Sequence, residues 1–123
     1  MTTGLILFAH GARDPRWAEP FERLRQKVAA ARPGMPVSLA FLELMTPDLG
    51  AATAALAAQG CTSIRVVPIF LGQGGHVRQD LPRLVGETQT RHPGVTFDLQ
   101  PAIGEDDTVL ARIADVCVGG MPT

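Results

Sequence analysis

Three side chains that can bind a metal ion or accept a proton follow apolar segments of the chain. His10 comes directly after the apolar residues 4–9, Glu43 closes the segment 37–43, and His76 follows the segment 63–68 through a glycine-containing loop. An imidazole has an unperturbed pKa of about 6.5, so it can hold a metal or exchange a proton near neutral pH. Two imidazoles and one carboxylate suit a divalent ion such as cobalt, nickel, iron or zinc.

Each of these residues also has a purely structural interpretation. His10 precedes Gly11 and could bond backbone groups at the end of a strand, and His76 could simply begin a helix. The carboxylate of residue 43 follows two apolar residues and is costly to bury unpaired. Its role could therefore be that of a metal ligand, a proton acceptor or a salt-bridge partner. Both histidines follow strands, and this placement favours a shared site.

His92 has a different setting. It precedes Pro93 and Gly94 in a predicted turn at the opposite edge of the sheet, so we expect an exposed and inert side chain. The sequence contains no His-x-x-x-His or Cys-x-x-Cys motif. A metal site therefore has to be assembled from loops that are far apart in the chain.

The loop before His76 reads Leu-Gly-Gln-Gly-Gly over residues 71–75, and Arg13, Arg16 and Arg78 flank the two histidines. The backbone of Gly74 and Gly75 could cradle a phosphate or leave room for a large flat ligand, and the arginines could pair with acidic groups on it. The first strand is not followed by Gly-x-Gly-x-x-Gly, and Gly-Lys-Ser/Thr is missing. Nucleotide binding is therefore disfavoured.

The elements that must position these residues alternate between strand and helix. The patterns predict strands at 4–9, 37–43, 63–68 and 95–99, and helices at 14–31, 46–60, 76–90 and 107–118. Pro20 predicts that the regular part of the first helix starts nearer Trp17 or is kinked, and Pro82 predicts that the regular part of the third helix starts near Asp80. For the second helix, Thr46-Pro47-Asp48 predicts a hydroxyl cap followed by a proline in the first turn.

This order predicts an α/β fold, with one domain over residues 1–123, a four-stranded parallel sheet, and helices on both faces. Ligands of such sheets bind at the carboxyl ends of the strands, which is where His10, Glu43 and His76 are predicted to lie. The three side chains are therefore expected to share one edge of the sheet.

Composition narrows the function further. The chain has 123 residues, 46% of them hydrophobic and 19% charged, and a net charge of −1, which is typical of one soluble domain and argues against nucleic-acid binding. Cys61 and Cys117 lack metal-motif spacing, so we expect reduced cysteines, buried or half-buried, in a cytoplasmic protein. The chain shows neither a secretion signal nor an apolar run of about 20 residues, so no membrane association is expected.

Three segments together resemble the class II tetrapyrrole chelatases, and within them the small CbiX group of sirohydrochlorin cobaltochelatases. They are residues 9–15 (Ala-His-Gly-Ala-Arg-Asp-Pro), residues 41–43 with Pro47-Asp48 following, and residues 67–71 leading into 74–82. Ala12 departs from the family pattern, because relatives often have serine there. Gln73 is a second departure, with no role assigned.

The resemblance implies a metal-inserting lyase of cobalamin biosynthesis. His10 and His76 would hold the divalent metal, most readily cobalt, with Glu43 as ligand or base, and the tetrapyrrole would lose two N–H protons. Arg13, Arg78, Gly74 and Gly75 would contact the tetrapyrrole, and no organic cofactor is implied. Long members of the family contain two such halves, so this chain is expected to act as a homodimer.

Other functions stay open on the sequence alone. The same site would suit an iron chelatase for sirohaem or a nickel chelatase, since the ligand set does not choose among these metals. A non-catalytic carrier of metal or tetrapyrrole is an alternative of another class. A flavodoxin-like phosphate or nucleotide binder is the weakest alternative.

Overall fold

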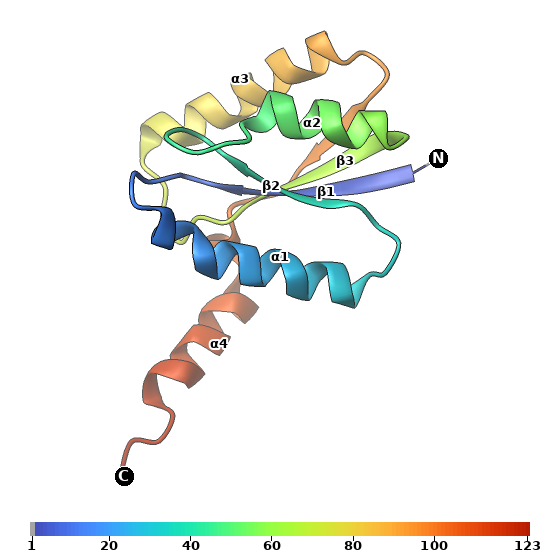
Figure 1. Ribbon diagram of the computed structural model, residues 1–123. Coiled ribbons are helices and arrows are strands. Elements are labelled where there is room, and N and C mark those ends of the chain that lie inside the picture. Colours follow the sequence, from blue (N-terminus) through green and yellow to red (C-terminus); the bar gives the residue numbers. More distant parts are fainter. Residues whose placement is uncertain (1) are drawn as a thin grey trace.

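The computed structural model describes residues 2–123, with the side chain of His76 excepted. One sheet of four parallel strands lies in the order β2-β1-β3-β4 (Figure 1). Its elements are β1 (Thr2–Ala9), a 3-10 turn η1 (Pro15–Ala18), α1 (Glu19–Ala31), β2 (Val37–Phe41), α2 (Leu49–Ala58), β3 (Cys61–Pro68), α3 (Gly75–Arg91), β4 (Thr96–Leu99), a 3-10 turn η2 (Ile103–Glu105) and α4 (Asp107–Val118).

Helices cover both faces of the sheet, which confirms the predicted α/β architecture (Figure 1). On one face, Ile6 and Phe8 of β1 pack in a core with α2 and α3. On the other face, Leu7 and Ala9 pack against α1. Neighbouring residues of β1 thus enter different cores, which explains why residues 4–9 are apolar without interruption.

The predictions for the second strand and the second helix need correction. The strand ends at Phe41 rather than at residue 43, because the chain there leaves the ladder for a bend. The helix cap is Asp48, whose carboxylate accepts a hydrogen bond of 2.8 Å from the backbone N–H of Ala51. Thr46 and Pro47 precede the helix, so neither acts as the predicted hydroxyl cap or first-turn proline.

The two predicted proline effects turn out differently. Before Pro20 the chain forms the 3-10 turn η1, and the regular helix α1 begins only at Glu19, so the proline sits in the first turn where its missing N–H costs nothing. Pro82 does not delay the third helix: α3 begins at Gly75 and keeps Pro82 inside it. A helix of 17 residues tolerates the loss of one hydrogen bond at this position.

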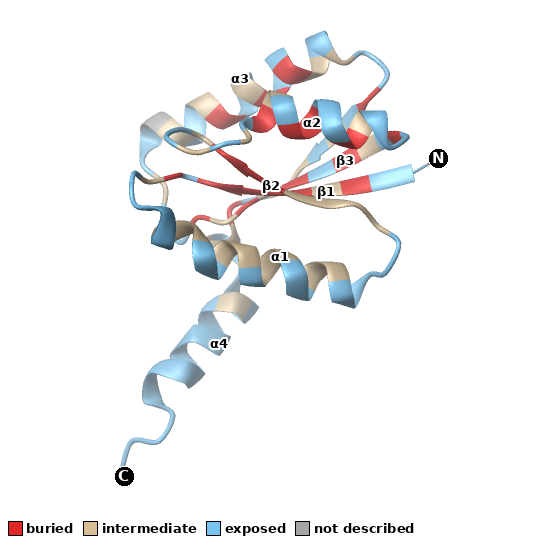
Figure 2. Ribbon diagram, viewed as in Figure 1, coloured by how far each residue is buried: buried red, intermediate tan, exposed pale blue. Residues whose placement is uncertain are grey.

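The last helix lies outside both layers. In Figure 1, α4 leaves the body beneath α1 and points away from the sheet, and Figure 2 shows it as almost entirely exposed. Cys117 on this helix is exposed, contrary to the prediction of a buried or half-buried thiol. Cys61 is buried as predicted, and burial raises the pKa of its thiol. Within residues 2–123, every helix falls short of the length or the apolar character needed to cross a lipid bilayer.

Candidate metal and tetrapyrrole site

The backbone between β1 and β2 brings His10 and Glu43 together. The ladder of these parallel strands continues beyond their ends: the N–H of Leu42 donates to the carbonyl of Ala9 at 2.9 Å, and the N–H of Glu43 donates to the carbonyl of His10 at 3.1 Å. The two residues therefore emerge side by side at the carboxyl edge of the sheet, as the sequence predicts.

Gly11 makes this close approach possible. Its φ is +99°, and a Cβ at this position would lie only 1.8 Å from the carbonyl oxygen of Glu43. Any side chain here would push the Glu43 backbone away from β1. The glycine after the histidine is thus a packing requirement of the site.

The side chains of His10 and Glu43 form an exposed pair. Nε2 of His10 lies 3.3 Å from Oε1 of Glu43, and the side chains are 48% and 56% exposed. Two donors bound to one ion at about 2.1 Å stand about 3.0 Å apart at a right angle and about 3.4 Å apart at a tetrahedral angle. The observed separation falls between these values, so the pair has the spacing of a chelate and is open to a guest.

Phe70 supports the imidazole. Its ring lies edge-on to His10, with a centroid distance of 6.2 Å, and it also contacts Phe8. Phe70 is almost fully buried, so it can restrict the orientation of the imidazole. Phe70 was not among the predicted site residues, and its position two residues beyond the end of β3 was the available signal.

A tight turn follows Glu43. Leu44 has a φ of +67°, and the N–H of Met45 donates to the carbonyl of Glu43 at 2.8 Å, which closes a three-residue turn. This conformation is strained for leucine. The side chain is nevertheless 57% exposed, and Leu71 on the loop after β3 is 62% exposed. Two large apolar side chains therefore reach solvent from loops at the carboxyl edge of the sheet.

The third predicted ligand is only partly placed. The backbone of His76 belongs to the first turn of α3, one residue after the helix begins, and its side chain lies outside the described residues. Among the side chains that the structure does describe, no three from His, Cys, Asp and Glu are grouped so as to hold a metal ion. The structure thus brings together His10 and Glu43 of the predicted set.

The predicted contact residues around this pair are accessible. Gly74 and Gly75 are exposed, their φ angles are ordinary, and a Cβ at either would meet open space. The fold itself therefore does not require glycine at these positions, whereas close approach of a ligand would. Arg13 and Arg78 are also exposed. Arg16 instead pairs with Asp14 at 2.8 Å on the surface.

His92 lies away from this site, as predicted. It follows α3 and lines a groove with Gly60 and Cys61, at the start of β3 and hence at the opposite edge of the sheet. The prediction of an exposed side chain is wrong, because the residue is half-buried. Its backbone N–H bonds to the end of α3, which gives it a structural position.

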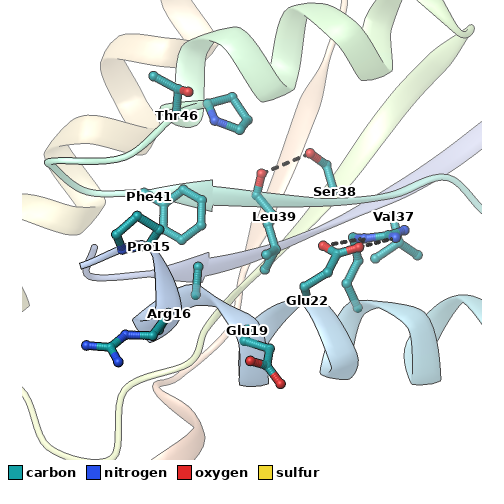
Figure 3. A pocket seen from close by; sticks show the side chains of 12 residues that line it. Pro15, Arg16, Glu19, Glu22, Val37, Ser38, Leu39, Phe41 and Thr46 are labelled. Carbon is teal, nitrogen blue, oxygen red and sulfur yellow. Dashed lines mark hydrogen bonds and ion pairs between the residues drawn. The ribbon is translucent and has the colours of Figure 1, made fainter. Parts of the chain in front are cut away.

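A second groove, of about 760 Å³, lies between α1 and β2 (Figure 3). Its wall includes Pro15 of η1 and Thr46 of the loop after β2, but neither His10 nor Glu43 lines it. The carboxylate of Glu22 there pairs with Arg25, whose guanidinium holds the pKa of that carboxyl below its ordinary value. The groove offers little reactive chemistry compared with the carboxyl edge.

Several known proteins are similar in sequence to this chain. The model of the CbiX family matches residues 4–117. A sirohydrochlorin cobaltochelatase of Saccharolobus islandicus (strain Y.G.57.14 / Yellowstone #1) is 34% identical over 96% of this chain and 92% of its own. That of Methanocaldococcus jannaschii is 34% identical over 72% of this chain, and the match spans 62% of that protein. The chain thus covers less than two thirds of some relatives.

Solved structures share the fold. A CbiX protein from Marinobacter aquaeolei VT8 is 34% identical, with a TM-score of 0.84 over 94% of this chain and 93% of its own. SirB from Bacillus subtilis, in a structure with Fe³⁺, is 27% identical, with a TM-score of 0.81 over 99% of this chain but only 49% of SirB. The whole of this chain therefore corresponds to about half of SirB.

Proposed function

Because the chain belongs to the CbiX family, we propose that it inserts a divalent metal ion, most readily cobalt, into sirohydrochlorin, as a homodimer of the cobalamin pathway. The observation that carries this proposal is the exposed pair of His10 and Glu43, 3.3 Å apart at the carboxyl edge of the sheet. The names of the relatives from Saccharolobus and Methanocaldococcus support cobalt and sirohydrochlorin.

The reaction needs a metal donor and a proton acceptor in one place. One divalent ion replaces two pyrrole N–H hydrogens, so two protons leave for each metal inserted. The imidazole of His10 and the carboxylate of Glu43 would hold the ion together, with His76 as a second imidazole donor. As pyrrole nitrogens take over the ion, the released side chains become free to accept the protons.

The surroundings of the pair suit a flat apolar ring that carries acidic groups. Leu44 and Leu71 offer apolar contact, and Gly74 and Gly75 leave room for close approach. Arg78 and Arg13 would pair with the carboxylates of the tetrapyrrole.

The homodimer follows from the size of this ligand. The carboxyl edge of one small sheet covers a macrocycle on one side only, whereas ligands of this size are usually enclosed. SirB supplies twice the chain length in a single polypeptide. Two copies of this chain facing one another would provide the second wall.

Two alternatives share the same residues. The structure of SirB with Fe³⁺ supports an iron chelatase for sirohaem as one alternative. The nitrogen and oxygen donors would equally accept nickel. A carrier of metal or tetrapyrrole would bind both without releasing metallated product.

The test is an anaerobic assay with sirohydrochlorin and cobalt, iron or nickel, followed by the absorbance change on insertion. We expect multiple turnovers, fastest with cobalt, and loss of insertion in His10→Ala and His76→Ala while His92→Ala stays active. Binding without turnover would identify a carrier, and full activity of His10→Ala would contradict the assigned site. Arg78→Ala should weaken tetrapyrrole binding more than metal binding, and equal losses would argue against a carboxylate contact.

A further inference from the structure

Two glycines of this chain lie directly against the backbone of a distant segment. All thirteen glycines belong to the part of the chain that the structure describes, and only at Gly11 and Gly104 would a Cβ overlap such a backbone. The overlap at Gly11 is with the carbonyl oxygen of Glu43, at 1.8 Å, and that at Gly104 is with the carbonyl oxygen of Leu71, at 1.7 Å. Gly11 brings Glu43 beside His10, and the second close approach needs a reason of its own.

The backbone conformation of Gly104 does not require glycine. The residue lies in η2, between β4 and α4, and its φ is not positive. Its N–H donates to the carbonyl of Phe70 at 2.9 Å, and the backbone of Leu71 fills the space that a side chain would need. Alanine would fit the local conformation but would push the segment of Phe70 and Leu71 away. The contact with this segment is therefore the reason for the glycine.

The turn that carries Gly104 is itself anchored. Ala102, which precedes the turn, is 4% exposed and belongs to the same core as Phe70. The N–H of Gln100 donates to the carbonyl of Val66 at 2.9 Å, which continues the β3–β4 ladder beyond its last pair. The turn η2 is therefore a firm support for the segment after β3.

Phe70 is fixed on both sides by backbone hydrogen bonds. The N–H of Ile69 donates to the carbonyl of Phe8 at 2.8 Å, which continues the β1–β3 ladder. The carbonyl of Phe70 itself accepts the bond from Gly104. Leu71, the next residue, is already 62% exposed. Gly104 therefore holds the last fixed point of the chain before the loop that leads to α3.

This anchoring directs the ring of Phe70 at His10. Phe70 is 7% exposed, and its ring meets the imidazole edge-on, with a centroid distance of 6.2 Å and an interplanar angle of 63°. The imidazole is also 3.3 Å from the carboxylate of Glu43, but a bound ion would draw both of these donors towards itself. The ring of Phe70 is thus a restraint on His10 that does not depend on the ion.

We propose that Gly104 is a positioning residue of the metal site. It holds the backbone of Phe70, whose ring fixes the imidazole of His10, and Nε2 of His10 thereby stays directed at the ion that Glu43 shares. Donor groups must be held within about 0.5 Å and about 10–20° of their productive geometry, so a small shift of the Phe70 backbone is enough to disturb the site. In its effect on metal insertion this role rests on the proposed function, whereas the orientation of the imidazole is a property of the metal-free protein.

The first test follows the imidazoles of the metal-free protein by NMR. The chain has three histidines, and His10→Ala identifies the signals of His10. Gly104→Ala should shift these signals, because the imidazole protons lie in the ring current of Phe70. Gly94→Ala is the matched control, since Gly94 has no positive φ and open space around it, and it should leave them in place. Unmoved His10 signals in Gly104→Ala would overturn the proposal.

If Gly104→Ala does not fold, Ile103→Gly takes its place. Ile103 begins η2 and is half-buried, so glycine there loosens the turn without an overlap. The same His10 signals should shift, by a smaller amount. Constant signals in this variant would overturn the proposal equally.

The second test measures cobalt affinity by titration. Gly104→Ala and Phe70→Leu should each weaken cobalt binding by about 10- to 100-fold, as is usual when the support of a metal ligand is removed. Phe97→Leu is the control for the second variant, because Phe97 packs against the same core but lies on β4. It should lower the stability to a similar degree and leave the cobalt affinity unchanged. Full affinity in Gly104→Ala or in Phe70→Leu would overturn the proposal, since a merely structural role spares the affinity.

The route through Phe70 is tested by combining the two changes. If Gly104 acts on His10 by holding Phe70, then Gly104→Ala has nothing further to disturb once the aromatic ring is removed. The double variant should therefore bind cobalt within about 2-fold of Phe70→Leu alone. Losses that multiply would show that Gly104 acts by another route and would overturn the proposal.

The insertion assay separates this role from the proposed function. If the unaltered protein binds cobalt without inserting it, while Gly104→Ala shifts the His10 signals and weakens cobalt binding, the positioning role stands and the proposed reaction fails. If the unaltered protein inserts metal, and Gly104→Ala does so at the original rate with unmoved signals, the positioning role fails and the proposed reaction stands.

Discussion

Nε2 of His10 lies 3.3 Å from Oε1 of Glu43, and this contact joins the ends of two neighbouring parallel strands. It depends on backbone hydrogen bonds that carry the β1–β2 ladder past its last residues, and on a glycine that leaves space for the second loop. The chemistry of the pair therefore depends on backbone geometry. The side chains and the backbone can be tested by separate substitutions.

Glu43→Gln keeps the shape of the side chain but removes its charge and proton affinity. We expect metal affinity to fall by about 10- to 100-fold and insertion by at least about 100-fold. Titration with cobalt and the insertion assay measure the two effects. Asp98→Asn is the matched control, because this carboxylate lies outside the site and pairs with Arg65. Similar losses in both variants would remove the special role of Glu43.

Gly11→Ala should damage both stability and site. Its Cβ would overlap the carbonyl of Glu43 at 1.8 Å, and its φ of +99° is also unfavourable for alanine. We expect a loss of more than about 2 kcal/mol in the free energy of unfolding, measured by urea denaturation. Gly34→Ala is the control, because Gly34 has a φ of +88° but open space around it, so it should lose only about 1 kcal/mol. Equal losses would show that the contact with Glu43 is unimportant.

The sequence predicted the architecture well because its information is local. An uninterrupted apolar segment such as residues 4–9 indicates a strand covered on both faces, and the alternation of strands and helices then leaves few topologies. The edge that carries His10 and Glu43 followed from the same rule. The pattern did not predict where each element begins, since Asp48 rather than Thr46 caps α2 and Pro82 is tolerated inside α3.

The features that escaped prediction are set by contacts between distant parts of the chain. The positive φ of Leu44 has no signal in local composition, and the position of Phe70 two residues beyond β3 does not reveal that its ring contacts His10. The outward direction of α4 depends on Gly104 packing against the loop after β3. The helix itself was predicted at 107–118, but its amphipathic pattern does not reveal whether its own body or another molecule covers it.

Gly75→Ala should change stability and ligand binding in opposite directions. Gly75 begins α3 with an ordinary φ and open space, so alanine should stabilise the protein by about 0.4–1 kcal/mol. If the glycine allows close approach of the tetrapyrrole, the added methyl group should weaken sirohydrochlorin binding. Thermal unfolding and fluorescence titration measure the two effects.

Gly86→Ala is the control for this change, because it lies in the same helix with open space around it. It should stabilise the protein to a similar degree and leave tetrapyrrole binding unaltered. Unchanged binding in Gly75→Ala would show that the macrocycle does not approach this part of the loop.

The cap of α4 should depend on pH. Hydrogen bonds from the side chain and the backbone of Thr108 lower the pKa of Asp106 below its ordinary value. The stabilisation is therefore fully present above the pKa of the unfolded chain, about 3.9, and is lost as the pH falls through the lower folded value. Hydrogen exchange of α4 amides, corrected for intrinsic rates, should show lost protection in acid. Asp106→Asn caps without titrating, so its protection should vary less. Identical profiles would exclude this role of the carboxylate.

Leu44→Gly should relieve the strain of the turn beside Glu43. A φ of +67° costs a leucine about 1–2 kcal/mol, and the greater freedom of glycine in the unfolded chain costs about 0.5–1 kcal/mol, so the variant should gain up to about 1.5 kcal/mol. Leu71→Gly is the control, because Leu71 is similarly exposed and its φ is not positive, so it should gain nothing. Urea denaturation of both variants makes the comparison.

The same two variants test the apolar contacts proposed for the macrocycle. Removal of either exposed side chain should weaken sirohydrochlorin binding, since each loses apolar surface that the ligand would cover. Leu44→Gly would then be more stable yet bind less tightly, as expected where strain is retained for function. Increased stability with unchanged binding would show that the strained leucine does not contact the ligand. Decreased stability would show that the turn after Glu43 is not strained.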